Sequence, residues 1–213
     1  MKRKIIQIAN STQLVSLPRK WSLRYGIKKG EEINVEEEGN RIVLSTEKNY
    51  QSEKAVIDAD KWGVFLPRVI YSLYKKGCDE IRVNFSNINL LAGIQKSLGK
   101  ETVGFEIIDQ SKDYCVIKNV SGDLEDFEAI FRRTFLILLS MAQETSDSIK
   151  DQNFSNLKNV AFMEESNNRF TTTCRRLINK KGYSNFKQTG PIYYIIEEIE
   201  NLADQYKYLC TDL

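Results

Sequence analysis

The first thirty residues carry basic side chains and no acidic ones, a pattern that can bind a polyanion. The basic residues are Lys2, Arg3, Lys4, Arg19, Lys20, Arg24, Lys28 and Lys29. Residues 31–40 reverse the pattern, with five glutamates and no base. Such clustering makes an electrostatic footprint for a nucleic acid even where the net charge of the chain is only +2. An ordinary solvated face of a small domain shows the same pattern, so charge alone leaves both interpretations open.

Acidic side chains in the C-terminal part form a second candidate site. Glu200 and Asp204 are four residues apart, which places them on one face of a helix. Glu164 and Asn168 repeat that spacing further upstream. Carboxylates from facing helices can bind a divalent or iron-type metal, so Glu164, Glu200 and Asp204 are candidate metal ligands. An exposed acidic face gives the same spacing more often, and we expect no cofactor.

Composition excludes several classes of enzyme. The chain has no histidine, which rules out a Ser-His-Asp triad, a Cys-His dyad and an HExxH zinc site. Its glycines form no phosphate-cradling motif. The four cysteines are widely spaced, as is typical of buried, reduced thiols in a cytoplasmic protein. Because no apolar run has the length of a membrane span, we expect a cytoplasmic, non-enzymatic protein without membrane insertion.

Short strands and one short helix must position the N-terminal cations. Strands are predicted at residues 3–9, 12–17, 32–36 and 41–45. Pro18 suits the first turn of a helix, and Gly26 can take the left-handed conformation that ends one. Four short strands in fewer than fifty residues bury little surface, so dimerisation is the expected source of stability.

The segment RKIIQIANSTQLVSLPRKWSLRYGIKKGEEINVEEEGNRIVLS resembles the AbrB/MazE/SpoVT family of DNA-binding domains. The matching features are the Ser11-Thr12 turn, Val15-Ser16-Leu17-Pro18, Arg19-Lys20-Trp21, the Gly26–Gly30 pair and the turn at Glu38-Gly39-Asn40. The resemblance implies a swapped-hairpin β-barrel, in which two chains interleave to bind double-stranded DNA. It places five residues against DNA: Arg3, Lys4, Arg19, Lys20 and Arg24.

A polar linker at residues 46–53 separates this segment from a predicted small α/β domain, residues 53–120. The expected order is βαβαββ, with strands at 54–58, 80–85, 103–108 and 114–120 and helices at 64–76 and 88–98. Pro67 falls in the first turn of the first helix, and Gly77 follows its last lysines as a cap. A structural or dimerising role is the simplest interpretation of this domain.

Three amphipathic helices are predicted in residues 121–213, packed as an antiparallel bundle. Their apolar stripes are Leu124, Phe127, Phe131, Phe135 and Leu138, then Leu157, Val160, Phe170, Cys174 and Leu177, then Ile192, Ile195, Ile196, Ile199, Ala203, Tyr206 and Cys210. Asp123 is the predicted N-cap of the first helix, Gly182 ends the second, and Gly190-Pro191 begins the third.

The segments RTFLILLSMAQE, FMEESNNRFTTTCRRLINKKGY and IIEEIENLADQYKYLC resemble one three-helix repeat of the PhoU family, which takes part in regulating phosphate uptake. Glu200 to Asp204 is similar to the ExxxD metal motif of that family, whereas Asn168 replaces a charged ligand. PhoU proteins normally have two repeats, which leaves open a short member, a dimer that supplies the second repeat, or a shortened chain. The AbrB-like and PhoU-like combination resembles archaeal phosphate-uptake regulators.

The resulting prediction is a multidomain α+β protein. It has an AbrB-like DNA-binding and dimerisation domain at residues 1–48, the α/β domain at 53–120 and a PhoU-like bundle at 121–213. We expect a homodimeric or higher homo-oligomeric transcriptional regulator linked to phosphate uptake or metabolism, with a phosphate-signalling or transporter protein as a further partner. One alternative is a PhoU-like or antitoxin-like regulator that binds a protein and no DNA. The other, a metal-dependent enzyme built on Glu164, Glu200 and Asp204, is weakest because the chain shows no evident base or nucleophile.

Overall fold

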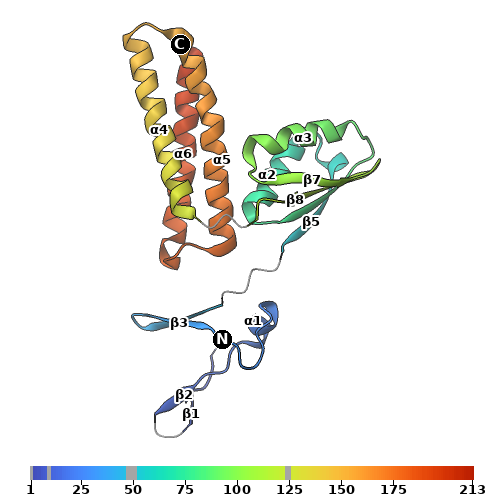
Figure 1. Cartoon of the computed structure of the whole chain (residues 1–213), viewed down its shortest axis with the longest axis vertical. Helices are drawn as coiled ribbons and strands as arrows, with labels where there is room; N and C mark the ends of the chain where they lie inside the picture. Colours follow the sequence, from blue (N-terminus) through green and yellow to red (C-terminus); the bar gives the residue numbers. More distant parts are fainter. Residues whose placement is uncertain (1, 9–10, 47–51, 123–125) are drawn as a thin grey trace. The chain divides into compact units, whose positions relative to one another are not determined.

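A computed structural model of the chain describes residues 2–8, 11–46, 52–122 and 126–213. The chain divides into two compact units, Met1–Gln51 and Ser52–Leu213 (Figure 1). The first unit contains the predicted DNA-binding domain, and the second contains both the α/β part and the helical bundle. Most of the predicted linker, at residues 47–51, lies outside the described residues.

The first unit consists of two hairpins and a short helix. Strands β1 (Ile6–Ile8) and β2 (Thr12–Leu14) pair antiparallel, and both are shorter than predicted. Helix α1 (Arg19–Arg24) follows, and strands β3 (Asn34–Glu38) and β4 (Arg41–Ser45) form the second antiparallel hairpin. The described part of this single chain holds two separate two-stranded sheets that do not close into a barrel. The predicted barrel of two chains stays a prediction.

Each end of α1 follows from its local sequence. Pro18, with a φ of −63°, precedes the helix, as its fixed backbone angle favours. Gly26 takes a φ of +59°, so the chain leaves the helix while the Ile27 amide still donates to the Ser22 carbonyl at 2.9 Å. The strand that was predicted to reach Ala9 ends at Ile8, and Ala9 lies outside the described residues.

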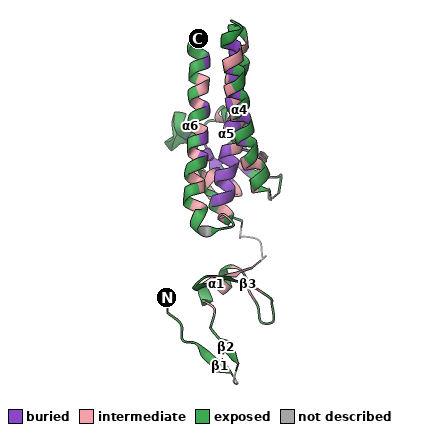
Figure 2. Ribbon diagram, turned by 90° about the vertical axis from the view of Figure 1, so that its left-hand side faces the viewer, coloured by how far each residue is buried: buried purple, intermediate pink, exposed green. Residues whose placement is uncertain are grey.

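No residue whose burial is described in the first unit is buried (Figure 2). Apolar side chains on both hairpins are open to solvent, and Ile6 and Ile42 are 57% and 68% exposed. The exposed set is Ile5, Ile6, Ile8, Leu14, Val15, Leu23, Val35, Ile42 and Val43. Within the described residues, this unit therefore has no hydrophobic core of its own.

The second unit begins with a four-stranded sheet. Its strands are β5 (Lys54–Asp58), β6 (Glu80–Asn84), β7 (Phe105–Gln110) and β8 (Tyr114–Asn119), in the spatial order β5-β6-β8-β7. Only the β5–β6 pair is parallel among these strands. Helices α2 (Leu66–Lys76) and α3 (Leu90–Glu101) pack on one face of the sheet, which gives the predicted βαβαββ order (Figure 1).

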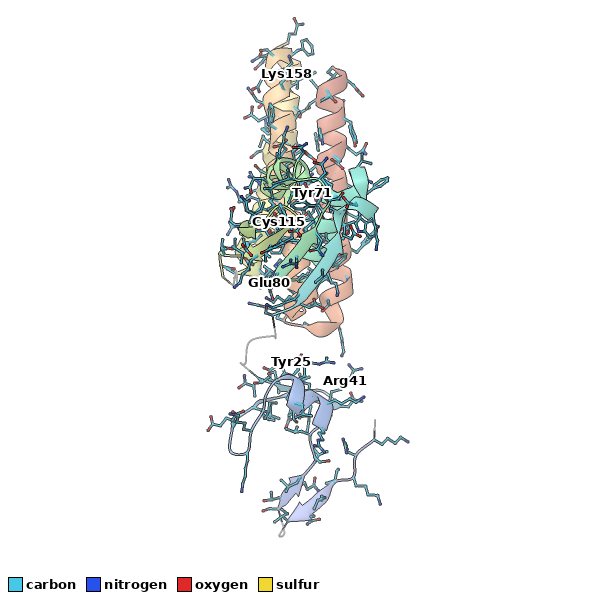
Figure 3. The ribbon with its side chains drawn as sticks, turned by 90° about the vertical axis from the view of Figure 1, so that its right-hand side faces the viewer. Tyr25, Arg41, Tyr71, Glu80, Cys115 and Lys158 are labelled. Atoms are coloured by element: carbon cyan, nitrogen blue, oxygen red, sulfur yellow. The ribbon has the colours of Figure 1, made fainter. Side chains whose placement is uncertain are left out.

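Alternation along the strands determines which side of this sheet is buried. Ile81 and Val83 of β6 and Ile117 of β8 are fully buried under the helices, whereas Arg82 between them is exposed. Figure 3 shows Cys115 inside this layer and Arg41 on the surface of the first unit. Helix α2 ends as predicted at Gly77, whose φ of +108° lets the Cys78 amide reach the Leu73 carbonyl at 3.0 Å.

Three long helices complete the second unit. They are α4 (Phe127–Lys150), α5 (Leu157–Lys181) and α6 (Thr189–Asp212), and the predicted three-helix region is confirmed. Asp126 caps α4 by accepting from the Ala129 amide at 2.9 Å, whereas the predicted cap Asp123 lies outside the described residues. No helix in the described parts of the chain has both the length and the apolar character needed to cross a bilayer.

Two positions of the predicted apolar stripes are wrong. Phe135 of α4 is 41% exposed and Ile195 of α6 is 39% exposed, while Ile137 and Met141 supply the buried side of α4. Apolar residues surround α4 from 135 to 139, so the spacing alone does not show which side meets the neighbouring helices. Leu124, the first residue of the predicted stripe, lies outside the described residues.

Helix α5 joins the bundle to the α/β layer through buried charge. The Arg176 guanidinium donates to the carbonyls of Tyr74 and Cys78 at 2.9 and 2.6 Å, and to the Asp79 carboxylate at 2.6 Å. Lys180 donates to the same Asp79 oxygen at 2.7 Å. These side chains are 6% to 13% exposed, so their charges are stabilised mainly by one another and little by water.

We expect Asp79→Ala to lower the free energy of unfolding by about 3 kcal/mol, because it leaves two buried cations without their carboxylate. Chemical denaturation of the full chain measures the change. Glu80→Ala is the matched control, since it breaks an exposed pair with Lys54 at 2.9 Å and should cost less than about 1 kcal/mol. Equal losses in the two variants would contradict the structural role of Asp79.

Candidate nucleic-acid interface

Helix α1 presents its basic side chains to solvent. Arg19, Lys20 and Arg24 are all exposed, whereas Trp21 is half-buried. The Trp21 ring meets the Tyr25 ring one turn later, with centroids 5.7 Å apart. The aromatic contact lies within the helix and its C-cap, and the exposed cations are available to a partner.

A hollow of about 390 Å³ gathers four of the five predicted DNA-binding residues. Its described lining is Arg3, Pro18, Arg19, Lys20, Trp21 and Arg24. Arg3 lies before β1 and reaches α1 from a distant part of the sequence. Lys4 is exposed but does not line the hollow. We call this surface the basic hollow.

Positive charge dominates the basic hollow. Its described lining contains four cations and no carboxylate. Arg3, Lys4, Arg19, Lys20 and Arg24 form no ion pair with any described residue, so their charges are not neutralised within that part of the chain. Guanidinium groups can bind phosphate in a two-pronged geometry and can also read the edge of guanine, so this surface suits a nucleic acid.

Two lining residues were not among the predicted contacts. Pro18 and Trp21 supply the apolar walls of the basic hollow. Both residues adjoin Arg19 and Lys20 in the sequence Pro-Arg-Lys-Trp, and this position could have identified them as part of the site. The charge count missed them because it registers only ionisable residues.

The predicted metal ligands form ion pairs with two different cations of the bundle. Glu164 of α5 lies 3.1 Å from the Lys207 ammonium of α6, and Asp204 lies 3.8 Å from the same nitrogen. The Asn168 amide also donates to Glu164. Glu200 is part of a different contact, 2.7 Å from Arg175, which also holds Glu197 at 2.6 Å.

These residues form what we call the α5–α6 polar seam, which consists of Glu164, Asn168, Arg175, Glu197, Glu200, Asp204 and Lys207. Among the described residues, no group of three or more His, Cys, Asp or Glu side chains is placed to hold a metal ion. Arg175 and Lys207 already neutralise the candidate carboxylates, so the arrangement does not fit the multinuclear cluster that the family resemblance implies. We derive no chemistry through a metal.

Burial raises the pKa of the Glu164 carboxyl above its ordinary value, and the neighbouring Asp204 carboxyl adds to the rise while Lys207 opposes it. Glu164 is 2% exposed, which makes loss of hydration the leading cause. Glu164 has therefore lost most of its hydration in the contact between α5 and α6.

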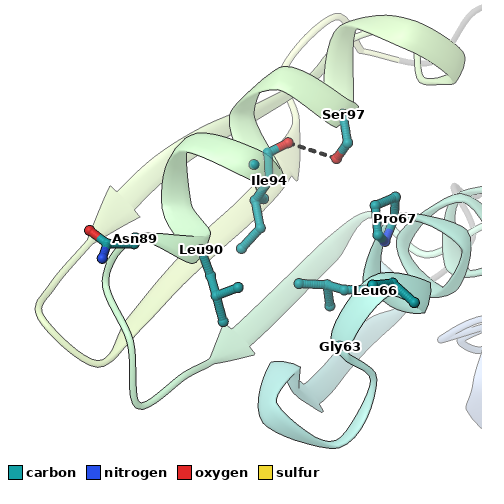
Figure 4. Close-up of a pocket in the computed structure, with 9 residues that line it drawn as sticks. Gly63, Leu66, Pro67, Asn89, Leu90, Ile94 and Ser97 are labelled. Carbon is teal, nitrogen blue, oxygen red and sulfur yellow. Dashed lines mark hydrogen bonds between the residues drawn. The ribbon is translucent and has the colours of Figure 1, made fainter.

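A second hollow, of about 350 Å³, lies between α2 and α3 (Figure 4). Its described lining is Gly63, Val64, Leu66, Pro67, Asn89, Leu90, Gly93, Ile94 and Ser97, and none of these residues is charged. The Ser97 hydroxyl donates to the Ile94 carbonyl at 2.7 Å, so its proton is already engaged. This lining offers no group for acid–base or nucleophilic chemistry.

The cysteines are free and buried, as predicted. Burial raises the pKa of Cys115 to about 11 and that of Cys174 to about 12. Because the thiolate is the nucleophilic form, these two protonated thiols are unsuited to covalent catalysis near neutral pH.

Comparisons of the chain with protein-family models, with curated proteins and with solved structures found no match. The resemblances to the AbrB and PhoU families therefore rest on the residues quoted for them.

We expect Glu164→Gln to flatten the dependence of stability on pH. Because the pKa of Glu164 is raised in the folded chain above the ordinary 4.5, its contribution to stability is fully present below that value. The contribution is lost as pH rises through the raised value. Denaturation of both proteins between about pH 4 and 7 measures the difference, with Glu165→Gln on the exposed side of the same turn as the control. Parallel curves for wild type and Glu164→Gln would contradict the assignment.

Proposed function

We propose that this chain is a homodimeric DNA-binding transcriptional regulator that binds double-stranded DNA through two basic hollows, one from each chain. The observation that carries the proposal is the exposure of apolar and basic side chains in the first unit. Its described residues bury no side chain, while they expose apolar residues on both hairpins and gather four cations in one hollow. The described part of this unit lacks a core, and the described lining of its basic hollow lacks a carboxylate. A second chain would cover the apolar residues, and DNA would supply the negative charge.

Exposed strands support the dimer. The two hairpins are separate two-stranded sheets, and such hairpins are marginally stable in water unless another element covers them. Interleaving the hairpins of two chains would cover Ile6, Ile8 and Ile42 and would pair the free strand edges. The swapped-hairpin barrel implied by the AbrB resemblance is one such arrangement.

Charge supports DNA as the ligand. A two-fold dimer would present two copies of the basic hollow, and two-fold proteins bind two half-sites on a duplex. Contacts from lysine and arginine to phosphates would position the protein, and Arg19 or Arg24 could read guanine in the major groove. The alternative of a protein ligand predicts a co-purifying protein and no binding to DNA.

The second unit supplies the regulatory part of the proposal. Its bundle packs on the α/β layer through α5, so a partner bound to the bundle would also act on the sheet. A link to phosphate uptake or metabolism, and a phosphate-signalling or transporter partner, rest on the PhoU resemblance alone.

We expect Arg19→Ala to weaken DNA binding by roughly tenfold without unfolding the chain. If a dimer makes about six phosphate contacts, the logarithm of the binding constant should fall with the logarithm of salt concentration at a slope of about −5. The variant loses one contact in each copy, so its slope should be shallower by about 2. Fluorescence anisotropy with mixed-sequence genomic duplexes across a salt series measures both quantities.

Arg169→Ala is the matched control, because Arg169 is an exposed arginine of the second unit. It should leave the affinity and the slope unchanged. Salt-independent binding by the wild-type protein would refute the electrostatic part of the proposal.

We expect Ile8→Asp to raise the dissociation constant of the dimer at least tenfold, because it places a charge among the apolar residues that the dimer would cover. DNA affinity should fall with it. Ile8 is 51% exposed, so the substitution puts no charge into an existing core of the single chain. Sedimentation equilibrium of the full chain measures association, with Val64→Asp, at a position 87% exposed in the second unit, as the control. An unchanged dissociation constant would show that the first hairpin takes no part in the dimer.

A further inference from the structure

Two apolar stripes on neighbouring helices of the bundle are left uncovered. The residues repeat every seven positions along each helix, which is the period of one helix packed along another. We call them together the α4–α6 face, consisting of Phe135, Ala142 and Ile149 of α4 and Ile195, Leu202 and Leu209 of α6. Phe135 and Ile149 are 41% and 42% exposed, and Leu202 and Leu209 are 48% and 44% exposed.

The stripe on α6 points away from α5. Since a helix turns by about 100° per residue, Leu202 and Asp204 lie on opposite flanks of the buried Ala203. The Asp204 flank faces α5, because Lys207 on that flank contacts Glu164 of α5 at 3.1 Å. The Leu202 flank is therefore turned toward α4 and solvent.

The stripe on α4 lies on the same side of the contact between α4 and α6. Glu144 accepts from Asn156, just before α5, and Thr145 contacts Cys210 of α6 at 3.4 Å. Going around α4 from Glu144 through Met141 to Thr145, Ala142 lies further on in the same direction, beyond the contact with α6. The two stripes therefore lie beside each other on the surface formed by α4 and α6, on the side opposite α5. Figure 1 shows these two helices running in the same direction.

The chemistry of the α4–α6 face favours a copy of itself. The six residues include no charged or polar side chain, so the face offers nothing to an acidic or basic partner. Leu139, 66% exposed, extends the apolar surface on α4. Covering these side chains in two copies would remove on the order of 1,000 Å² from water, which reaches the lower limit for a stable dimer interface.

We propose that the α4–α6 face packs against the same face of a second copy, forming two layers of two helices each. The two-fold axis would lie perpendicular to the helices and cross them at mid-stripe, which sets α6 against α6 of the other copy and brings Leu202 close to Leu202 of that copy. The contact does not depend on DNA binding. Where the first units also pair, they would hold the two faces at an effective concentration of about millimolar and so strengthen it.

Disulfide trapping of the full chain tests the contact directly. All four native cysteines are buried, so Leu202→Cys introduces an accessible thiol. We expect a mild oxidant to convert most of this variant to a covalent dimer. Phe162→Cys is the control, because Phe162 is 68% exposed on α5, away from the α4–α6 face. Trapping of Leu202→Cys no greater than that of Phe162→Cys would overturn the proposal.

Sedimentation separates this contact from the pairing of the first units. Ile8→Asp alone should retain concentration-dependent self-association, and Ile8→Asp with Leu202→Arg should be monomeric, whereas Ile8→Asp with Phe162→Arg should behave like Ile8→Asp. Circular dichroism checks that each variant is folded. If Ile8→Asp alone is fully monomeric at about 100 µM, the α4–α6 contact is refuted while the DNA-binding dimer stands. If Leu202→Arg leaves the association of the Ile8→Asp chain unchanged, the face is not the second interface.

Discussion

A segment with two separate hairpins and one short helix cannot cover its own apolar residues, and this constraint underlies everything inferred about the first unit. Ile6, Ile8 and Ile42 remain open to water, and no residue whose burial is described there is buried. Exposed apolar surface of this kind marks an interaction site in a stable protein. The cations of the basic hollow lie in the same unit, so the exposed apolar residues and the positive charge on which the proposed function rests occur together.

Helix α5 shows the opposite situation, because elements pack on it from several sides. It contacts α4 and α6 in the bundle and α2 and α3 in the α/β layer. Its two buried arginines bind different elements. Arg175 binds carboxylates of α6, and Arg176 binds the end of α2. Burying a guanidinium is costly unless its charge is paired, so the ion pairs of both arginines restrict where α5 can lie. The bundle and the α/β layer therefore form one compact unit.

Periodicity predicted the order of elements well and the tertiary contacts poorly. The βαβαββ order, the three long helices and the helix ends at Gly77 and Gly182 follow from local patterns that the chain obeys. The buried side of α4 could not be predicted, because apolar residues surround that helix near Phe135 and only packing selects among them. Charge clustering found four residues of the basic hollow. Spacing grouped Glu200 with Glu164, but it could not show that Arg175 and Lys207 separate them, since those contacts join different helices.

The α5–α6 polar seam also restricts how these two helices can move. Each helix contributes one cation to the seam. Arg175 of α5 pairs with Glu197 and Glu200 of α6, and Lys207 of α6 pairs with Glu164 of α5. If α6 slid along α5 by seven residues in one direction, Lys207 would lie opposite Arg175, so that two cations would face each other. If α6 slid by seven residues in the other direction, Tyr193 would take the place of Glu200 beside Arg175. Both displacements are electrostatically penalised, so piston-like motion along the bundle axis is disfavoured.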